Sequence, residues 1–338
     1  MNRKYDAKEG SMVTLNVEMK DVVQAYSRIR DYVAKTPLIY SKETSERVGS
    51  EVWFKMESLQ IVGSHKIRGC MNNILQLSEE DLKKGVVAAS SGNHAQALAY
   101  AAKLLGTTAV VCVPESTPMI KRHGVLKYGA KLVVYGADYN EAEAKAHEIE
   151  ALEGRKYVHS FEANEAVAGQ GTIAIEALLE KGDFDVILAP TGGGGLVDGL
   201  AIAAKALNPD IKVYGLQTDT SPPWYKSFYE KRLNNDCDFL PTCADGLEGE
   251  ITWPNVDLAI RCGVDGIIVV SEQATREGVK WMAAKHHFMI EGSSAVCLAA
   301  LFEGHEELKD KKVLCIITGG NIDLDKFTKI CADKYDWE

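Results

Sequence analysis

The sequence predicts an α/β protein with parallel sheets, and two observations carry this prediction. Short apolar runs rich in β-branched residues alternate with helical patterns along most of the chain. The runs are almost continuously apolar, as parallel strands covered on both faces should be. Repeated alternation of strand and helix is typical of the α/β class. A length of 338 residues is enough for two domains that share a core.

The predicted elements follow one another in strand–helix order. Strands are predicted at Val86–Ala89, Ala109–Val113, Lys131–Tyr135, Val186–Ala189, Lys212–Leu216, Ile267–Val270 and Lys312–Ile317. Helices are predicted at Ala95–Leu105, Glu141–Leu152, Gly171–Leu179, Leu196–Ala206 and Gln273–Lys285. The stretch Thr220–Trp253 is less periodic, which indicates a loop-rich excursion near a site. Residues 1–10 and 331–338 are predicted to be loosely ordered ends.

Charge and cysteine content exclude several classes of function. Lys and Arg number 38 against 48 Asp and Glu, so the net charge is −10 and no global field favours nucleic acid or anionic membrane. The sequence has no apolar run long enough to span a bilayer and no visible signal peptide. Eight scattered cysteines without a CxxC pair fit reduced thiols better than a disulfide framework. We therefore expect a cytoplasmic protein with no nucleic-acid or membrane partner.

Three polar turns that contain glycine each follow a predicted strand. They are Ser90-Ser91-Gly92-Asn93-His94, Thr191 followed by Gly192-Gly193-Gly194-Gly195-Leu196, and Thr318-Gly319-Gly320-Asn321. Ligands of open parallel sheets bind at the carboxyl ends of strands, so these turns indicate one ligand held from several sides. Four consecutive glycines at a helix start expose backbone N–H groups with the helix dipole behind them, which favours a phosphate.

The phosphate-bearing ligand can be narrowed by exclusion. The glycine run fits neither the dinucleotide pattern G-x-G-x-x-G nor a P-loop, and zinc-protease spacing is absent. The segment GSHKIRGC places Lys66 between two glycines. Pyridoxal phosphate requires both a phosphate nest and a lysine, which attacks the cofactor aldehyde only when the amine is neutral. Either Arg68 or burial could lower the pKa of Lys66 for this purpose.

At these motifs the chain resembles the fold-type II pyridoxal-phosphate enzymes, the tryptophan-synthase-β group, and is most similar to the serine/threonine dehydratase and serine racemase family. The similarity covers about Val33 to Asp323, with its motifs in the family's order. These are S-x-K-I-R-G, SSGNHAQALAYAAKLLG, EAVAGQGTIAIE, TGGGGLVDGLA and TGGN.

The resemblance implies a role for each matching position. Lys66 would form the Schiff base with pyridoxal 5′-phosphate and move the α-proton of a small amino-acid substrate. Ser91 matches the position of the second acid/base, on the opposite face, in serine racemase. Asn93 would bind the 3-hydroxyl of the cofactor, and Thr318 would face its ring nitrogen. The phosphate would be bound by Gly192, Gly193, Gly194, Gly195 and the Leu196 N–H; the substrate carboxylate would be bound by Ser90, Ser91, Gly92, Asn93 and His94.

Three segments depart from the family pattern. His65 stands where the dehydratases usually have Phe; it either packs under the cofactor, tunes Lys66 or contacts an acidic substrate group. The usual E-P-S-G-A segment reads EGSSA, from Glu291 to Ala295. The divalent-ion site of some relatives has Gln217 and Pro223 in place of carboxylates, which leaves Asp219 as a lone candidate ligand.

The resemblance also implies architecture and activity. We expect a large domain of residues 11–85 and 163–330, a small domain of residues 86–162 that carries SSGNH, the cofactor between them, and a homodimer. The predicted reaction is loss of water from a β-hydroxy amino acid such as serine or threonine, giving a 2-oxo acid and ammonia. The alternatives are an amino-acid racemase, a dehydratase for 3-hydroxyaspartate or a bulkier substrate, and a non-catalytic or NAD-binding protein.

Overall fold

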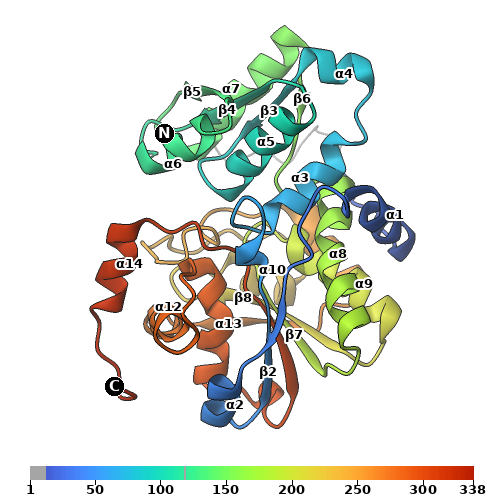
Figure 1. Cartoon of the computed structure of the whole chain (residues 1–338). Coiled ribbons are helices and arrows are strands. Elements are labelled where there is room, and N and C mark those ends of the chain that lie inside the picture. The colour runs from blue at the N-terminus through green and yellow to red at the C-terminus, as the bar shows by residue number, and fades with distance from the viewer. Residues whose placement is uncertain (1–12, 118) are drawn as a thin grey trace.

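The computed structural model describes residues 13–117 and 119–338, and its strands form two separate sheets (Figure 1). The large sheet has the order β1-β2-β10-β7-β8-β9, and all neighbouring strands except β1 and β2 are parallel. The small sheet has the order β5-β4-β3-β6 and is fully parallel. The strands are β1 (Leu38–Tyr40), β2 (Glu51–Lys55), β3 (Val86–Ala89), β4 (Ala109–Val113), β5 (Lys131–Val134), β6 (Lys156–Tyr157), β7 (Val186–Pro190), β8 (Lys212–Thr218), β9 (Gly266–Val270) and β10 (Lys312–Ile316).

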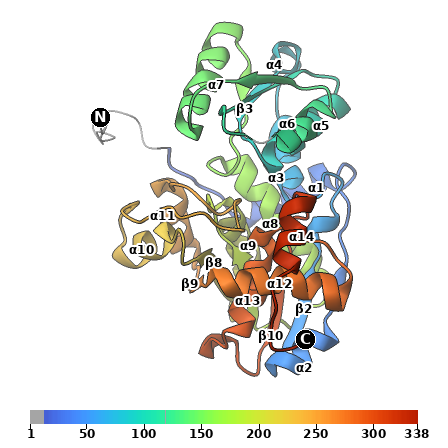
Figure 2. The same ribbon diagram turned by 90° about the vertical axis from the view of Figure 1, so that its left-hand side faces the viewer.

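Helices flank both sheets, and the two views agree that the small sheet with α5 and α7 lies above the large-sheet body (Figures 1 and 2). The predicted α/β class is confirmed. The α-helices are α1 (Met19–Ile29), α2 (Lys42–Val48), α3 (Lys66–Ile74), α4 (Glu79–Lys84), α5 (Asn93–Leu104), α6 (Met119–Leu126), α7 (Tyr139–Glu153), α8 (Asn164–Glu180), α9 (Gly195–Leu207), α10 (Pro223–Glu230), α11 (Trp253–Cys262), α12 (Glu272–His286), α13 (Gly292–Phe302) and α14 (Leu324–Cys331). Two 3₁₀ turns lie at Glu57–Leu59 and Glu306–Leu308.

Alternate residues of the strands point to opposite faces, and each face carries its own apolar cluster. Ile187 and Leu314 belong to the cluster on one face of the large sheet, whereas Leu188 and Cys315 belong to the cluster on the other. The small sheet is likewise covered on both faces. Burial on both faces explains why these strands read as continuous apolar runs in the sequence.

Every predicted strand and helix is present, with ends that differ by a few residues in most cases. The largest difference is α8, which begins at Asn164 rather than at Gly171. Gly169, which has a low helix propensity, lies in the part of α8 that the prediction left out. A Cβ on Gly169 would lie 2.6 Å from the Cα of Gly69, so the glycines serve a close crossing of α3 and α8.

A second glycine contact continues the stack from α8 to α9. A Cβ on Gly199 would lie 2.3 Å from the carbonyl oxygen of Val167. The three helices α3, α8 and α9 are therefore packed backbone to backbone. This packing fixes the start of α3, where Lys66 lies, relative to the start of α9, where the glycine run lies.

The division into domains stays a proposal, and α3 is the element that joins its two parts. Its residues Ile67 and Met71 pack in the cluster that covers the small sheet, although the sequence boundaries assign them to the large domain. In Figure 1, α3 lies between the small-sheet part and α8.

The C-terminal tail makes more contacts than the sequence predicts, while the predicted loose end at residues 1–10 lies outside the described residues. The indole of Trp337 meets that of Trp281 on α12 edge to face at 5.1 Å, and its Nε1 donates to Glu277. Two large aromatic rings bury enough apolar surface to hold a short tail against a helix. The excursion Thr220–Trp253 contains α10 and is otherwise irregular.

Candidate active site

The three polar turns follow β3, β7 and β10, at the carboxyl ends of these strands. The segment before α3 is bound to the turn after β10. Ser64 pairs with Gly319 as an isolated bridge, and the N–H of His65 donates to the carbonyl of Thr318 at 2.9 Å. The N–H of Gly320 donates to the carbonyl of Gly63 at 2.9 Å. These bonds bring Lys66 to the end of β10.

Lys66 is the first residue of α3 and its side chain is half-buried. Its Nζ donates to the carbonyl oxygen of Ser160 at 3.2 Å. Burial lowers the pKa of Lys66 to about 8, and the carboxylate of Glu291 partly opposes this shift. A lysine with such a pKa has a reactive neutral fraction near physiological pH, as attack on a carbonyl group requires.

Arg68 does not have the tuning role considered for it from the sequence. Its guanidinium is fully buried and forms paired hydrogen bonds to the carboxylates of Glu57 and Glu176, all at 2.8 Å. Lys55 also binds Glu176, at 2.6 Å. Arg68 is thus neutralised within a buried cluster of four charges, and burial is what lowers the pKa of Lys66.

The glycine run is a backbone cradle at the amino end of α9. Gly194 has φ +99°, a conformation that favours glycine, and α9 begins at Gly195. A Cβ on Gly193 would lie 2.2 Å from the ring of Phe161, and one on Gly194 would lie 2.3 Å from the ring of Trp224. The indole Nε1 of Trp224 donates to the carbonyl of Gly192 at 2.5 Å. The packing of Phe161 and Trp224 therefore requires glycine at these positions, in addition to any requirement that a bound anion makes.

Phe161 and Trp224 were not identified from the sequence. Each is distant along the chain from the glycines that it contacts, and neither stands in a recognisable motif. Leu196, the remaining predicted residue of the cradle, is buried in the first turn of α9.

Thr318 lies at the end of β10 and is buried, and so is Ser294, whose hydroxyl contacts it. Its Oγ1 is 3.0 Å from the Oγ of Ser294 on α13. The same Ser294 Oγ accepts a hydrogen bond from the N–H of Gly319 at 2.8 Å. Ser294 therefore orients both the turn after β10 and the hydroxyl of Thr318. The sequence segment EGSSA, which contains Ser294, did not indicate this contact.

The turn after β3 leads into α5 and contains both half-buried and buried side chains. Ser90, Ser91, Gly92 and Asn93 are half-buried, so ligands could reach them. His94 is buried, and its Nε2 lies 2.8 Å from the carbonyl of Val158. Burial lowers the pKa of His94 to about 3, so its ring is neutral. The imidazole of His94 anchors the turn to the end of β6.

His65 is buried at the start of α3, with Nδ1 3.3 Å from the carbonyl of Thr318. Burial, helped by the charge of Lys66, lowers the pKa of His65 to about 3. The ring is therefore neutral near pH 7. A neutral imidazole cannot offer a positive charge to an acidic substrate group, so of the three roles considered, that contact has the least support.

Asp219 lies outside this group of residues. It is exposed, and its Oδ1 accepts the N–H of Glu272 at 3.1 Å, at the start of α12. The side-chain oxygen of Gln217 accepts the N–H of Trp224 at 2.8 Å. Over residues 13–117 and 119–338, no group of three or more His, Cys, Asp or Glu side chains could hold a metal ion.

Glu291 is a site residue that the sequence did not identify. Its buried carboxylate accepts hydrogen bonds from Nδ2 of Asn93 at 2.9 and 3.1 Å. Burial raises the pKa of Glu291 to about 7, which the contact with Asn93 opposes. In the sequence, Glu291 is distinguished only by its place in the segment Glu291–Ala295, which departs from the family pattern.

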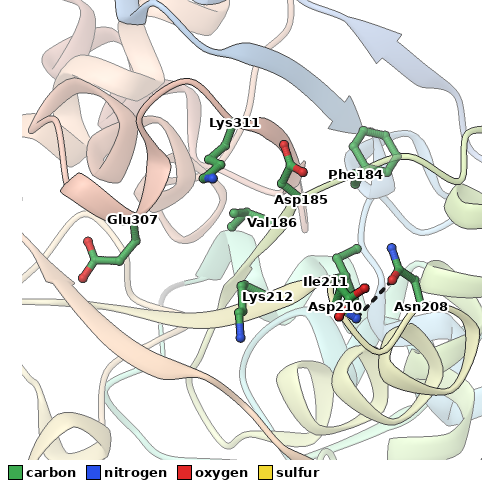
Figure 3. A pocket seen from close by; sticks show the side chains of 9 residues that line it. All are labelled: Phe184, Asp185, Val186, Asn208, Asp210, Ile211, Lys212, Glu307 and Lys311. Atoms are coloured by element: carbon green, nitrogen blue, oxygen red, sulfur yellow. Dashed lines mark hydrogen bonds between the residues drawn. The ribbon is translucent and has the colours of Figure 1, made fainter.

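A hollow of about 200 Å³ at the amino ends of β7 and β8 is unrelated to this constellation (Figure 3). Asp185, Asp210, Lys212 and Lys311 are among the residues that line it. It lies at the opposite end of the large-sheet strands from the turns after β7 and β10, and charges of both signs surround it.

Comparisons with known proteins agree with this geometry. Residues 29–319 match the family described as pyridoxal-phosphate dependent enzymes. A serine racemase of Dictyostelium discoideum is 38% identical over 93% of this chain and 98% of its own length. An L-threonine ammonia-lyase of Thermotoga maritima is 36% identical over 93% of this chain and 78% of its own length. The structure of maize serine racemase superposes with a TM-score of 0.87 at 32% identity, covering 93% of this chain and 96% of that one.

The family match covers both sheets and the first two polar turns and ends at Gly319, within the third. It rules in a pyridoxal-phosphate enzyme in place of the NAD-binding alternative. No helix in the described parts of the chain is long and apolar enough to cross a membrane. The chain belongs to the family of pyridoxal-phosphate dependent enzymes, and its cofactor is pyridoxal 5′-phosphate.

Proposed function

We propose that this enzyme is an ammonia-lyase that removes water from a β-hydroxy amino acid of the serine or threonine type. The products are a 2-oxo acid and ammonia. The observation that carries the proposal is the set of contacts around Lys66, a lysine with a lowered pKa. The segment before it is bound to the turn after β10, and Asn321 of that turn donates to Asn93 of the turn after β3. Its Nζ donates to the carbonyl of Ser160, next to Phe161, whose ring packs on the glycine run after β7. The lyase and racemase activities of the related proteins belong to the same class of chemistry at the α-carbon of an amino acid.

The residues present fit the cofactor. The cradle Gly192–Gly195 has no side chains and opens the amino end of α9, so its N–H groups would hold the phosphate. Lys66 would bind the aldehyde. Asn93 would contact the ring hydroxyl, and Thr318 would face the ring nitrogen. Bound pyridoxal phosphate supplies an electron-withdrawing ring that weakens the bond between the α-carbon and its hydrogen.

The side chains of the chain perform the proton transfers and the positioning. The turn Ser90–His94 would bind the substrate carboxylate through its N–H groups and hydroxyls. Lys66, in its neutral form, would accept the α-proton. The β-hydroxyl leaves with a proton as water, and the released unsaturated amine hydrolyses to the 2-oxo acid and ammonia. Closure of the small-sheet part over the turns would exclude water from these steps.

Racemisation is the principal alternative, because Ser91 could return a proton to the opposite face of the α-carbon. Incubation with L-serine in D₂O separates the two reactions. Elimination gives pyruvate, whereas racemisation gives deuterated D-serine. We expect pyruvate to form faster, and accumulation of D-serine without pyruvate would contradict the lyase assignment. A panel including threonine, 3-hydroxyaspartate and bulkier β-hydroxy amino acids, scored by 2-oxo acid release, identifies the substrate.

We further propose that the enzyme is a cytoplasmic homodimer. Leu59, Ile61, Met289 and Leu324 are 45%, 45%, 45% and 63% exposed. Their segments adjoin, since a Cβ on Gly320 would lie 3.0 Å from the carbonyl of Met289 and 3.6 Å from the Cβ of Ser58. Neighbouring exposed apolar residues are typical of interaction surfaces. Light scattering after gel filtration tests this, and we expect twice the mass of one chain. If Leu324→Asp is a monomer while the wild type is a dimer, these four apolar residues form the dimer interface.

A further inference from the structure

The carboxylate of Glu291 lies at the contact between α5, α13 and the turn after β10. The side chain is 7% exposed, and both oxygens accept from Nδ2 of Asn93, at 2.9 and 3.1 Å. A Cβ on Gly319 would lie 2.5 Å from Oε1 of Glu291, so the carboxylate packs directly on the backbone of the turn. Glu291 is therefore held on one side by the turn and binds Asn93 on the other.

The hydrogen bonds around Asn93 have a fixed direction. Above its pKa of about 7, Glu291 is a carboxylate that only accepts hydrogen bonds, so the NH₂ group of Asn93 must face it. On the other side, Nδ2 of Asn321 donates to Oδ1 of Asn93 at 2.7 Å and to the carbonyl of Val62 at 2.9 Å. Both ends of the Asn93 amide are thus determined. An NH₂ group has two hydrogens, so if one of them serves the Glu291 carboxylate, the other would be available to a ligand.

The same carboxylate contributes to the charge around Lys66. Its negative charge raises the pKa of Lys66 against the effect of burial. The other charged groups that face Glu291 are Asp245, which raises its pKa, and Lys121, which lowers it. The nearby rings of His65 and His94 are neutral because burial lowers the pKa of each to about 3.

We propose that Glu291 is a positioning residue for the cofactor: its carboxylate holds the amide of Asn93 in the orientation that presents an N–H to the cofactor. This inference rests on the proposed function, in which Asn93 contacts the ring hydroxyl. Glu291 itself acts through Asn93 and does not need to touch the cofactor.

A double-mutant cycle on cofactor affinity tests the proposal. The variants are Glu291→Gln, Asn93→Ala and the double variant, and the readout is the dissociation constant of pyridoxal phosphate from the apoenzyme, measured by fluorescence titration. Gln is nearly isosteric but no longer dictates the orientation of Asn93. We expect about tenfold weaker binding for Glu291→Gln, as for loss of a charge-assisted hydrogen bond. The double variant should bind no more weakly than Asn93→Ala, because the two residues act as one unit.

Glu303→Gln is the matched control. Glu303 follows the other end of α13, accepts the N–H of Ser271 at 2.9 Å, and undergoes the same change of charge. It should leave the affinity unchanged. Asn321→Ala, which releases the other end of the Asn93 amide, should weaken binding in the same direction and serves as the test if Glu291→Gln does not fold.

A second readout does not involve the cofactor. In the apoenzyme, the rate at which Lys66 is acetylated, followed by mass spectrometry across pH, reports its pKa. Glu291→Gln should shift the midpoint to lower pH, because the negative charge that favours protonated Lys66 is removed. Wild-type affinity in Glu291→Gln, or additive losses in the double variant, would overturn the proposal. A wild-type protein that takes up no cofactor would instead refute the proposed function on which it rests.

Discussion

At the scale of the residue, Lys66 combines reactivity with a cost in stability. Burial lowers its pKa to about 8 from 10.5, so the folded chain disfavours its charged form. Below pH 8 the amine is protonated in both the folded and unfolded states, and the full penalty of burying the charge applies. Between pH 8 and 10.5 the unfolded state binds more protons, so the free energy of unfolding rises with pH and the penalty disappears.

Replacing Lys66 by Met should therefore stabilise the apoenzyme at pH 7. We expect a gain of up to about 3 kcal/mol in the free energy of unfolding, from the size of the pKa shift. The gain should shrink between pH 8 and 10.5. Urea unfolding of both apoproteins at several pH values measures it. An equal difference at pH 7 and pH 10.5 would show that packing, and not charge, separates the two proteins.

A substitution at Gly193 tests the packing of the glycine cradle. A methyl group at this position would meet the ring of Phe161 at 2.2 Å, so Gly193→Ala must displace the ring or the loop. We expect a loss of about 1–3 kcal/mol in the free energy of unfolding, as for other overpacked sites, together with weaker binding of inorganic phosphate by isothermal titration. Gly182→Ala is the control, because its Cβ would meet only the carbonyl of Leu178, at 3.3 Å. Equal stability of Gly193→Ala and wild type would contradict the contact.

The sequence was most informative where one residue's chemistry is unusual. A lysine between glycines and four glycines at a helix start can be recognised without a structure. Phe161, Glu291 and Ser294 could not, because their roles come from contacts with residues far along the chain. The suggested tuning by Arg68 was wrong because its partners, Glu57 and Glu176, cannot be identified before the chain is folded.

At the scale of the element, α3 is held in place by the buried charge cluster. Arg68 follows Lys66 by two positions and forms paired hydrogen bonds to carboxylates of the 3₁₀ turn Glu57–Leu59 and of α8. The cluster contains two positive and two negative side chains, counting Lys55 with Glu57, Arg68 and Glu176. It is therefore neutral only while complete.

Arg68→Met should be strongly destabilising. It leaves two buried carboxylates with Lys55 as the only positive member of the cluster, and we expect a loss of about 3–5 kcal/mol in the free energy of unfolding. Lys84→Met removes an exposed ion pair with Glu80 and should cost at most about 1 kcal/mol. Thermal or urea unfolding of both variants measures the difference. Similar stability of the two variants would show that the cluster does not hold α3.

The strands that the sequence missed are weakly apolar or very short. The strand β2 carries charged residues at both ends and is only partly buried, so its apolar signal is weak. The strands β1 and β6 are only three and two residues long. The helix α8 begins seven residues before the predicted start at Gly171, and its Gly169 and Gly171 serve close contact with α3 and α9.

At the scale of the whole molecule, an ion pair joins the small-sheet part to the large-sheet part. Nζ of Lys121 on α6 binds Oδ2 of Asp245 at 2.6 Å, and Lys326 on α14 lies 3.7 Å from the same carboxylate. Asp245 precedes Gly246, whose carbonyl would lie 2.7 Å from a Cβ on Gly192. The pair therefore connects α6 to the loop that packs against the glycine cradle.

Reversing the charge of Lys121 should change how the small-sheet part sits against the large-sheet part. We expect Lys121→Glu to raise KM several-fold with little change in kcat, because like charges then oppose closure, and the exchange Lys121→Glu with Asp245→Lys to recover most of the loss. Lys309→Glu, which puts the same charge change into an exposed pair with Glu306 far from the turns, is the control. A double variant as impaired as the single one would show that the pair does not act between the two parts.

We propose that Lys66 is the residue that binds the cofactor. Borohydride reduction of the enzyme loaded with pyridoxal phosphate, followed by proteolysis and mass spectrometry, tests it directly by making the bond to the lysine permanent. We expect one modified peptide, carrying the reduced cofactor on Lys66. Modification of a different lysine, with Lys66 unmodified, would contradict it.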